Sequence, residues 1–336
     1  MPSQVDAQLD ALCIGNAIVD VIAQTEDSFL KDENLIKGSM RLIDETEAVR
    51  LYSAMGTTVE ISGGCAGNTA TGIASLGAKS GFVGKVAADS LGAAFRHDIT
   101  AAGVDFKTNE LKGGPATARS MILVTPDGER TMNTFLGACQ ELTPDDIVEQ
   151  TVSQASTIYL EGYLWDPPKA KDAFRKAATL AHDAGRDVAL TLSDSFCVDR
   201  FRDEFLELIR ANTIDLLFAN EAEIKTLYQT SDFDAAIAGI RTDCKLSAIT
   251  MGAQGSLTVT KSEIYSLPPP QVDNVVDLTG AGDLYASGFL TGIARGLPLI
   301  ECARLGGICA AEIISHIGAR PQSRLADHAA QGGFDF

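Results

Sequence analysis

Short apolar runs alternate with amphipathic stretches along the chain from Thr157 onward. The segments from Pro167 to Ala184 and from Arg200 to Arg210 carry apolar residues at helical spacing. The runs around them have the length and composition of buried strands: TIYLEG, DVALTLS and DLLFAN. Because strands separated by helices form βαβ units, this pattern predicts an α/β fold with a mostly parallel sheet.

The N-terminal part of the chain adds core elements and two segments that break the alternation. ALCIG and SGFVGK have the character of further buried strands, and GNTATGIASLG between them that of a small-residue helix. Segments 17–62 and 104–137 instead hold short alternating runs, and Pro126-Asp127-Gly128 in the second is a hairpin turn signal. We expect these segments to form antiparallel strands outside the main layer. They would build a small β lid on one unit that spans residues 1–330.

Two consecutive helices are expected towards the C-terminal end, in AGDLYASGFLTGIARG and LIECARLGGICAAEIISHIGA. Pro298 precedes the second of them and Gly318 follows it, as is typical of helix starts and ends. The segment with the strongest chemical signal lies directly before the first of these two helices.

Charge and composition narrow the class of partner. The 336 residues are 45% apolar, with 45 acidic and 27 basic residues and a net charge of -18. Such a field repels nucleic acids and anionic membranes, and no apolar stretch is long enough to span a bilayer. The N-terminus has no signal-peptide pattern. We therefore expect a cytoplasmic enzyme-sized protein with a small-molecule substrate and neither nucleic acid nor membrane as a partner.

Seven cysteines are scattered along the chain without CxxC spacing. This distribution favours buried reduced thiols over a disulfide framework or a zinc site.

A glycine-rich turn carries the sharpest chemical signal. Gly280, Ala281 and Gly282 lead directly into a helix, where successive backbone N–H groups form a site for negative charge. Asp283 in the first helical turn is placed to accept the proton of an attacking hydroxyl while the amides hold a transferring phosphoryl group. The alternative is that Asp283 only stabilises the start of the helix.

Asp277-Leu278-Thr279-Gly280-Ala281-Gly282-Asp283 resembles the D-T-x-G-A-G-D signature of the PfkB family of carbohydrate and nucleoside kinases, with leucine at its tolerant second position. Four further segments match family motifs in the same order: GNAIVD at 15–20, SGGCAGN at 62–68, NEAE at 220–223 and TMGAQG at 250–255. The resemblance covers nearly the whole chain. It implies a ribokinase-like three-layer α/β/α core with a lid, and ATP-dependent phosphorylation by direct in-line transfer.

The residues themselves fit a site for hydroxyl groups. Asp20 at a strand end offers two acceptors, Gly63 and Gly64 allow close backbone approach, and Asn68 adds a donor and an acceptor. Taken alone, Asp20 is also compatible with a solvated carboxylate and the glycines with an ordinary turn.

The resemblance assigns the nucleotide to the other end of the motif set. Thr250, Gly252 and Gly255 would bind the ATP phosphates, and a tight β-hairpin is the alternative. Asn220 and Glu223 would organise Mg²⁺ through water, although NEAE by itself is only a helix start.

The resemblance also implies one basic residue over the phosphates and, in part of the family, a monovalent cation such as K⁺. Arg130 is the candidate for the first role, with Arg119 as a weaker one and a solvated arginine as the alternative. The cation ligands would be Asp277, Thr279, Ile314, Ile317 and Ser323.

Other catalytic patterns are missing from the sequence. There is no GxxxxGK[ST] loop, no GxGxxG followed by an acidic residue, no HExxH-like spacing among the four histidines and no GxSxG elbow. These omissions remove the usual support for P-loop, dinucleotide, zinc-hydrolase and serine-hydrolase chemistry.

Substrate choice depends on shorter stretches. Asn16 and the segments ERTMNTFLGA and YLEGYLWDPP resemble the bacterial adenosine kinase branch, which adds Glu161, Tyr163 and Leu136 to the substrate set. Tyr163, Leu136, Trp165 and Phe135 are candidates for an apolar wall against a purine, or plain core residues. We expect phosphorylation of the 5′-hydroxyl of a purine nucleoside, best adenosine. A sugar kinase and a non-catalytic nucleoside sensor are the alternatives, and monomer and homodimer remain open.

Overall fold

The computed structural model describes residues 8–335, so the first seven residues of the predicted unit 1–330 lie outside it. Within this range the larger sheet has nine strands in the order β14-β13-β12-β11-β10-β9-β1-β5-β6. Pairing is parallel from β12 through to β6 and antiparallel only at β12-β13 and β13-β14. The strands are β1 Leu9–Ile14, β5 Ser80–Val83, β6 Asp105–Phe106, β9 Ala155–Glu161, β10 Asp187–Thr191, β11 Leu216–Asn220, β12 Leu246–Thr250, β13 Ser256–Thr260 and β14 Ile264–Leu267.

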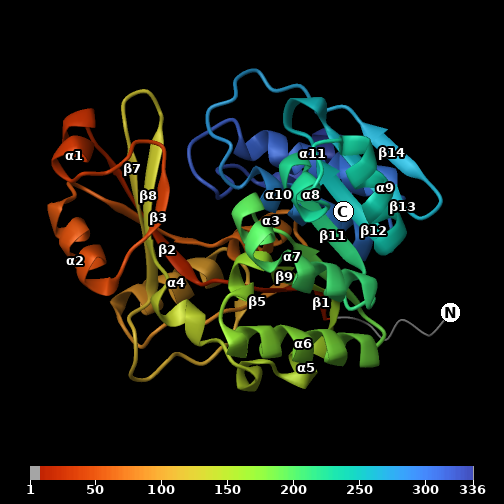
Figure 1. Cartoon of the computed structure of the whole chain (residues 1–336), viewed down its shortest axis with the longest axis horizontal. Helices are drawn as coiled ribbons and strands as arrows, with labels where there is room; N and C mark the ends of the chain where they lie inside the picture. The colour runs from red at the N-terminus through yellow and green to blue at the C-terminus, as the bar shows by residue number, and fades with distance from the viewer. Residues whose placement is uncertain (1–7, 336) are drawn as a thin grey trace.

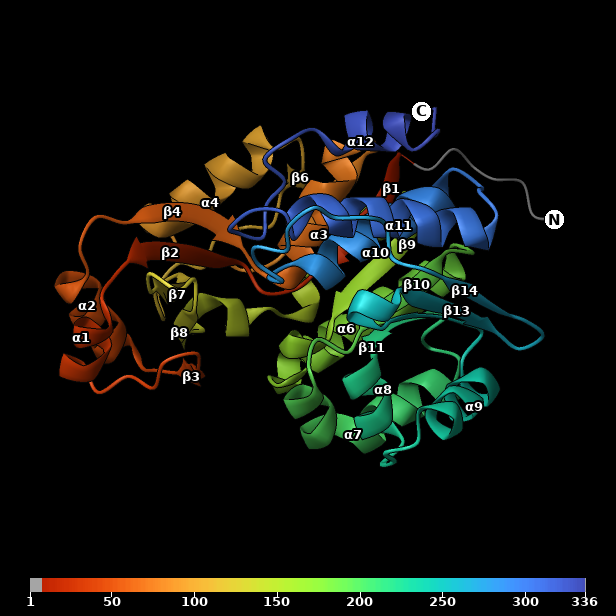
Figure 2. The ribbon, with the colours of Figure 1, turned by 90° about the horizontal axis from the view of Figure 1, so that it is seen from above.

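Helices cover both faces of this sheet (Figure 2). Along β9, Ile158 and Leu160 pack into one hydrophobic core and Tyr159 into another, because alternate residues of a strand point to opposite faces. One face carries α5 Glu149–Ser153, α6 Pro168–Asp183, α7 Ser195–Arg210, α8 Glu221–Leu227 and α9 Phe233–Asp243. The other carries α3 Cys65–Ser75, α4 Ser90–Ala101, α10 Ala281–Ala294 and α11 Leu299–Ile313, with α12 Leu325–Gln331 beside α11. The predicted three-layer α/β/α core is confirmed.

A second, five-stranded sheet stands beside the core, at the left of Figure 1, in the order β3-β8-β7-β2-β4. Segment 17–62 supplies β2 Ile18–Gln24, α1 Asp27–Asp32, β3 Met40–Leu42, α2 Glu45–Ala54 and β4 Val59–Gly63. Segment 104–137 supplies β7 Ala118–Val124 and β8 Arg130–Phe135, whereas its β6 pairs with β5 in the larger sheet. We call this smaller sheet with α1 and α2 the lid.

The lid is a mixed sheet, so the expectation of antiparallel strands is wrong in part. β7-β8 and β2-β4 are antiparallel, and Gly128 takes a positive φ of 84° in the turn between β7 and β8. β2-β7 and β3-β8 are parallel, because long connections through helices, not tight turns, separate these strands in sequence.

The two faces of the lid differ. Val19, Val21 and Met121 pack in the core that holds Leu30 of α1 and Leu51 of α2, so this face is covered by the helices. The strand register places Asp20, Ile22, Ile61, Met132 and Arg130 together on the opposite face. We call this opposite surface the inner face of the lid.

Helix boundaries agree with the sequence pattern to within about two residues except in α7 and α11, and α11 ends at Ile313, several residues before the predicted end near Gly318. Helix α7 begins at Ser195, five residues before the predicted start, because the Asp194 carboxylate caps it by accepting from Cys197 N, and the helix has a break at Phe201. Pro298 is the N-cap of α11, and Gly318 beyond its end has a φ of 108°. In residues 8–335, no helix is long and apolar enough to cross a membrane.

All seven cysteines are free thiols, and six of them are buried. The expectation of reduced, mostly buried cysteines is confirmed; only Cys65, at the start of α3, is partly exposed.

Candidate active site

Asp283 lies in the first turn of α10, directly after the glycine-rich turn. Gly280 is the N-cap and has a φ of 80°, a left-handed conformation that also brings it against Ala319, where an added Cβ would lie 2.9 Å from the alanine Cβ. Gly282 is exposed, and a Cβ there would meet no atom within 4 Å. The helix start is therefore open to a ligand at Gly282 and tightly packed beneath it at Gly280.

Asn68 of α3 holds the Asp283 carboxylate. Its Nδ2 donates to Asp283 Oδ2 at 2.9 Å, and Thr69 Oγ1 donates to the Asp283 carbonyl at 3.2 Å. The Asn68 Oδ1 atom is buried and has no hydrogen-bond partner among the described residues. A buried acceptor left open beside a carboxylate suits a ligand hydroxyl that donates to it.

The electrostatics at Asp283 favour a base that takes up protons near neutrality. Burial raises the pKa of Asp283 to about 6, against the opposing effects of hydrogen bonds from Asn68 and Cys65 and the nearby charge of Arg320. A carboxylate in this range is ionised at pH 7 and is more basic than an exposed aspartate, which suits proton acceptance from a hydroxyl.

Asp20 faces Asp283 from the lid. Burial raises its pKa to about 6, Arg320 and Arg130 lower it, and Asp283 raises it. No described residue donates a hydrogen bond to the Asp20 carboxylate, so both oxygens are available to a ligand. The two aspartates thus approach one space from opposite sides.

Two glycines make this approach possible. A Cβ on Gly63 would lie 2.5 Å from Asp20 Oδ2, and one on Gly64 would lie 2.1 Å from the Asn16 carbonyl oxygen. Gly64 also has a φ of 84° and forms the N-cap of α3. The predicted substrate residues Asn16, Asp20, Gly63 and Gly64 therefore lie together.

Glu161 occupies a different place from the one predicted. It is 1% exposed, and its Oε2 accepts from Ala66 N at 2.9 Å and from Asn16 N at 3.2 Å, while Oε1 accepts from Asn16 Nδ2 at 2.7 Å. Burial raises its pKa to about 7, against these donors. Glu161 therefore acts on the site through Asn16 and the start of α3, and a direct contact with substrate is not supported.

The predicted nucleotide residues meet at the edge of the larger sheet. Asn220 at the end of β11 is in register with Thr250 at the end of the parallel neighbour β12. Between β12 and β13, Gly252 is exposed with a φ of 56°, and Gly255 has a φ of 91° with its Cα packed under the Leu267 carbonyl. Carboxyl ends of parallel strands are the usual ligand edge of such sheets.

Asn220 and Glu223 form a capping box at the start of α8. Asn220 Oδ1 accepts from Glu223 N at 2.9 Å, and both Glu223 oxygens accept from Asn220. Glu223 is buried, and burial raises its pKa to about 7. In the described part of the chain, no group of three or more His, Cys, Asp or Glu side chains could hold a metal. Because the two side chains are engaged with each other, the pair fits contact with Mg²⁺ through water better than direct ligation.

Four of the five predicted monovalent-cation positions are engaged by protein contacts, and the contacts of the fifth, Thr279, are made by its N and Oγ1. Asp277 Oδ1 accepts from Thr279 N and Oγ1, and Oδ2 accepts from Gly318 N at 2.9 Å and pairs with Arg130 Nη1 at 3.1 Å. The Ile314 carbonyl accepts from Val276 N at 2.8 Å. The Ile317 carbonyl accepts from Gln322 Nε2, and Ser323 Oγ donates to Glu312 Oε1. The residues present do not fit a resident cation in this arrangement.

Arg130 lies against the turn before α10, from the inner face of the lid. Nη1 donates to Thr279 Oγ1 at 2.8 Å, and Nη2 is buried without a partner among the described residues. A guanidinium nitrogen left open beside a helix N-terminus suits an anionic ligand. Arg119 falls on the other face of the lid, where it stacks on Phe135, so the weaker candidate is not supported.

The predicted apolar wall is only partly available. Trp165 is 1% exposed and packs among Phe174 and Phe205, and Phe135 is also buried. Tyr163 and Leu136 are partly exposed, with the Tyr163 hydroxyl donating to Asp194 Oδ2 at 2.8 Å.

Sequence reasoning missed two features of the site. The inner face of the lid carries apolar side chains that are left open, including Met40 (48% exposed) and Leu42 (56% exposed), and strand alternation was the signal that could have found them. Arg320 lies near both Asp20 and Asp283, and no local pattern marks it.

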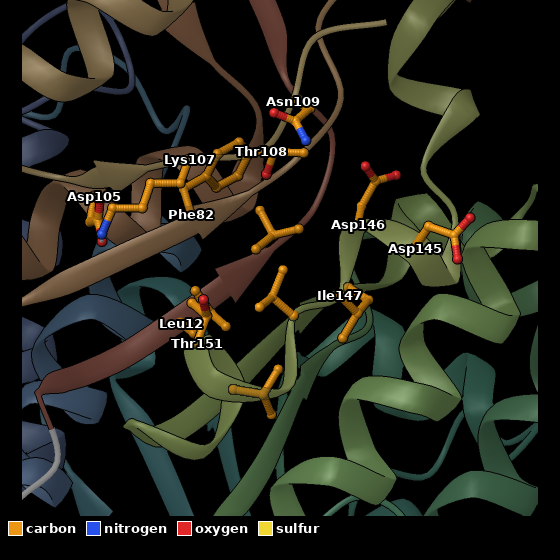
Figure 3. A pocket seen from close by; sticks show the side chains of 13 residues that line it. Leu12, Phe82, Asp105, Lys107, Thr108, Asn109, Asp145, Asp146, Ile147 and Thr151 are labelled. Carbon is orange, nitrogen blue, oxygen red and sulfur yellow. Dashed lines mark hydrogen bonds and ion pairs between the residues drawn. The ribbon is translucent and has the colours of Figure 1, made fainter.

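A separate hollow lies away from these residues (Figure 3). It is lined by Phe82 and Thr108 on one side and Ile147 on the other, and contains none of the predicted site residues. The lysines near it are paired with acids, Lys107 with Asp105 at 2.6 Å and Lys85 with Asp146.

Known proteins match this arrangement across the chain. The model of the pfkB family of carbohydrate kinases matches residues 8–325. The solved adenosine kinase from Sinorhizobium meliloti is 55% identical with a TM-score of 0.91, covering 97% of this chain and 100% of that one. A probable sugar kinase from Rhizobium etli is 50% identical with a TM-score of 0.91, covering 97% and 99%.

A third relative, the ATP-dependent ribose-1-phosphate kinase of Halopiger xanaduensis, is 30% identical over 236 residues, 68% of this chain and 72% of that protein. The chain therefore belongs to the pfkB family of carbohydrate kinases and is a phosphotransferase that acts on a hydroxyl acceptor.

Proposed function

We propose that the protein phosphorylates the 5′-hydroxyl of a purine nucleoside, best adenosine, from ATP by direct in-line transfer. The observation that carries the reaction is Asp283 held by Asn68 at the open start of α10, with Asp20 opposite it. The 55% identical adenosine kinase supports the choice of acceptor.

Each residue has a defined part in this proposal. Asp20 accepts hydrogen bonds from the ribose hydroxyls, and Asn68 Oδ1 accepts one more. Asp283 takes the proton of the 5′-hydroxyl as that oxygen attacks the terminal phosphoryl group. The amides of residues 281–283 and the open Arg130 nitrogen stabilise the charge that builds up on the phosphoryl oxygens.

The nucleotide would lie along the edge formed by Asn220, Thr250 and Gly252. Mg²⁺ bound to the phosphates would neutralise part of their charge, with Asn220 and Glu223 in contact through water. Since both side chains are engaged in the capping box, their contribution is to orient water and not to ligate directly.

A specific observation favours a nucleoside over a free sugar. The inner face of the lid continues from Asp20 into an apolar surface that includes Ile22, Met40, Leu42 and Met132. A sugar held by Asp20 and Asn68 leaves this surface in water, whereas a base attached to the ribose covers it. Burial of the base would contribute to binding.

A sugar kinase remains the second candidate. The probable sugar kinase from Rhizobium etli and the ribose-1-phosphate kinase carry that alternative. A sensor without activity is less well supported, because the glycine turn, Asp283 and Arg130 are all in place.

The test is ADP formation by the purified protein with adenosine, guanosine, inosine, ribose, ribose 1-phosphate and fructose in parallel. We expect the highest kcat/KM with adenosine. Turnover confined to the sugars would overturn the nucleoside proposal. Tight adenosine binding without turnover of any acceptor would overturn the kinase mechanism and favour the sensor.

A further inference from the structure

Arg320 reaches from the loop after α11 to the joint between the lid and the core. Its Nε donates to the Ser62 carbonyl at 2.7 Å and its Nη2 to Ser62 Oγ at 3.0 Å. Nη1 donates to the Gly67 carbonyl at 2.6 Å and to Thr71 Oγ1. The Arg320 side chain thus contacts both the end of β4 in the lid and the first turns of α3.

The neighbours of Arg320 bind the anion-binding turn. Gly318 N donates to Asp277 Oδ2 at 2.9 Å, and Ala319 packs directly beneath Gly280. Three consecutive residues, 318 to 320, therefore connect the turn before α10 with the joint at Ser62. This chain of direct contacts connects two elements that lie far apart in sequence.

Ser62 is held from the other side as well. Its N and Oγ both donate to Asp98 Oδ2 of α4, the former at 2.8 Å. Since Gly63 follows it and packs against the Asp20 carboxylate, a shift of Ser62 would move the substrate-binding aspartate. The position of Asp20 therefore depends on the contacts of Ser62.

The charge of Arg320 lies among three carboxylates. It is near Asp20, Asp98 and Asp283, and burial lowers its pKa to about 10, which leaves it charged at neutral pH. The same charge lowers the pKa of Asp20 and Asp283 relative to the effect of burial alone. Asp283 also faces Cys65, Tyr159, Glu161 and Glu223, all of them acidic or neutral groups.

We propose that Arg320 is a positioning residue for phosphoryl transfer, which fixes the lid joint at Ser62 relative to the turn at Gly280 and places its positive charge near Asp20 and Asp283. This role goes beyond the substrate and nucleotide contacts described above. Its kinetic test rests on the proposed adenosine kinase reaction.

The experiment compares Arg320→Lys, which keeps the charge but not the fork of donors, with Arg320→Gln, which removes the charge. Arg175→Gln on α6 is the control, because Arg175 is an exposed arginine whose partners are Asp172 and the Trp165 ring. The measurements are kcat and KM for adenosine from pH 5 to 9, and hydrogen exchange of the backbone amides of residues 60–71.

We expect kcat/KM to fall by about 10- to 100-fold in both Arg320 variants, since several charge-assisted hydrogen bonds are lost. The acid limb of kcat/KM should move to higher pH in Arg320→Gln and stay in place in Arg320→Lys. Exchange at residues 60–71 should accelerate in both, and the control should match the wild type throughout.

Two results would overturn the inference: unchanged exchange at residues 60–71, or an acid limb and KM in Arg320→Gln equal to those of the wild type. If Arg320→Gln does not fold, the test depends on Arg320→Lys. Kinetics and amide exchange in Arg320→Lys equal to those of the wild type would then overturn the inference. A wild type inactive on every acceptor would instead contradict the proposed function, and the exchange data would then decide the role of Arg320 alone.

Discussion

The Nδ2 atom of Asn68 lies 2.9 Å from Oδ2 of Asp283, although 215 positions separate the two residues in the chain. This contact joins the start of α3 to the start of α10 and fixes the orientation of the carboxylate. Asn68 engages only one of the two carboxylate oxygens, and the other is the candidate acceptor for the proton of a hydroxyl.

Replacement of Asp283 by asparagine should lower kcat by about 10²- to 10⁴-fold, because the proton acceptor is lost while the shape of the side chain is kept. Nucleoside binding, measured by calorimetry, should change little. Asp273→Asn, on the exposed part of the same loop, is the matched control. Full turnover by Asp283→Asn would remove Asp283 from the mechanism.

The pH dependence follows from the two facing aspartates. Burial raises the pKa of Asp283 and that of Asp20 to about 6, and both must be ionised for the proposed reaction. Activity should therefore be full above this value and fall as pH decreases through it, by more than tenfold per pH unit where both groups take up protons. A profile of kcat/KM that stays flat down to pH 5 would contradict this assignment.

Removal of the buried carboxylate at position 161 should destabilise the fold. Glu161→Leu leaves Ala66 N, Asn16 N and Asn16 Nδ2 without their acceptor, and we expect a loss of about 2–4 kcal/mol in the free energy of unfolding. Chemical denaturation measures it, with the exposed Glu149→Leu as control. An unchanged unfolding midpoint would show that these donors have other partners.

Gly63→Ala tests the close contact beneath Asp20. The added methyl would lie 2.5 Å from Asp20 Oδ2 and must displace the carboxylate, so KM for the nucleoside should rise by about tenfold or more. Gly56→Ala, where a Cβ meets no atom within 4 Å, should leave KM unchanged. Equal KM values in the two variants would mean that Asp20 does not bind the substrate.

Potassium should not be required for turnover. Because Arg130 Nη1 already pairs with Asp277 Oδ2 at 3.1 Å, replacing KCl by tetramethylammonium chloride at constant ionic strength should leave kcat unchanged. A strong activation by K⁺ would show that Arg130 leaves Asp277 during the reaction. That result would support the cation site that the family resemblance implies around Asp277 and Thr279.

Local patterns in the sequence were sufficient for the α/β core and for much of the site. Strand and helix periodicity determines which elements form, and a glycine turn before a helix places Asp283 at an N-terminus in any fold that contains it. The reaction class was identified because several motifs of a known kinase family occur in this chain in the same order.

Only the tertiary structure decided which residues share the site. Glu161 and Trp165 were predicted as site residues because they lie in the segment YLEGYLWDPP, yet strand direction and core packing bury both. Arg320 has no sequence signal, because its partners Ser62 and Gly67 lie more than 250 positions away. The amino-acid sequence thus determined the elements and the catalytic turn, while long-range packing, which depends on contacts between distant residues, decided the position of the lid and of the charges around Asp283.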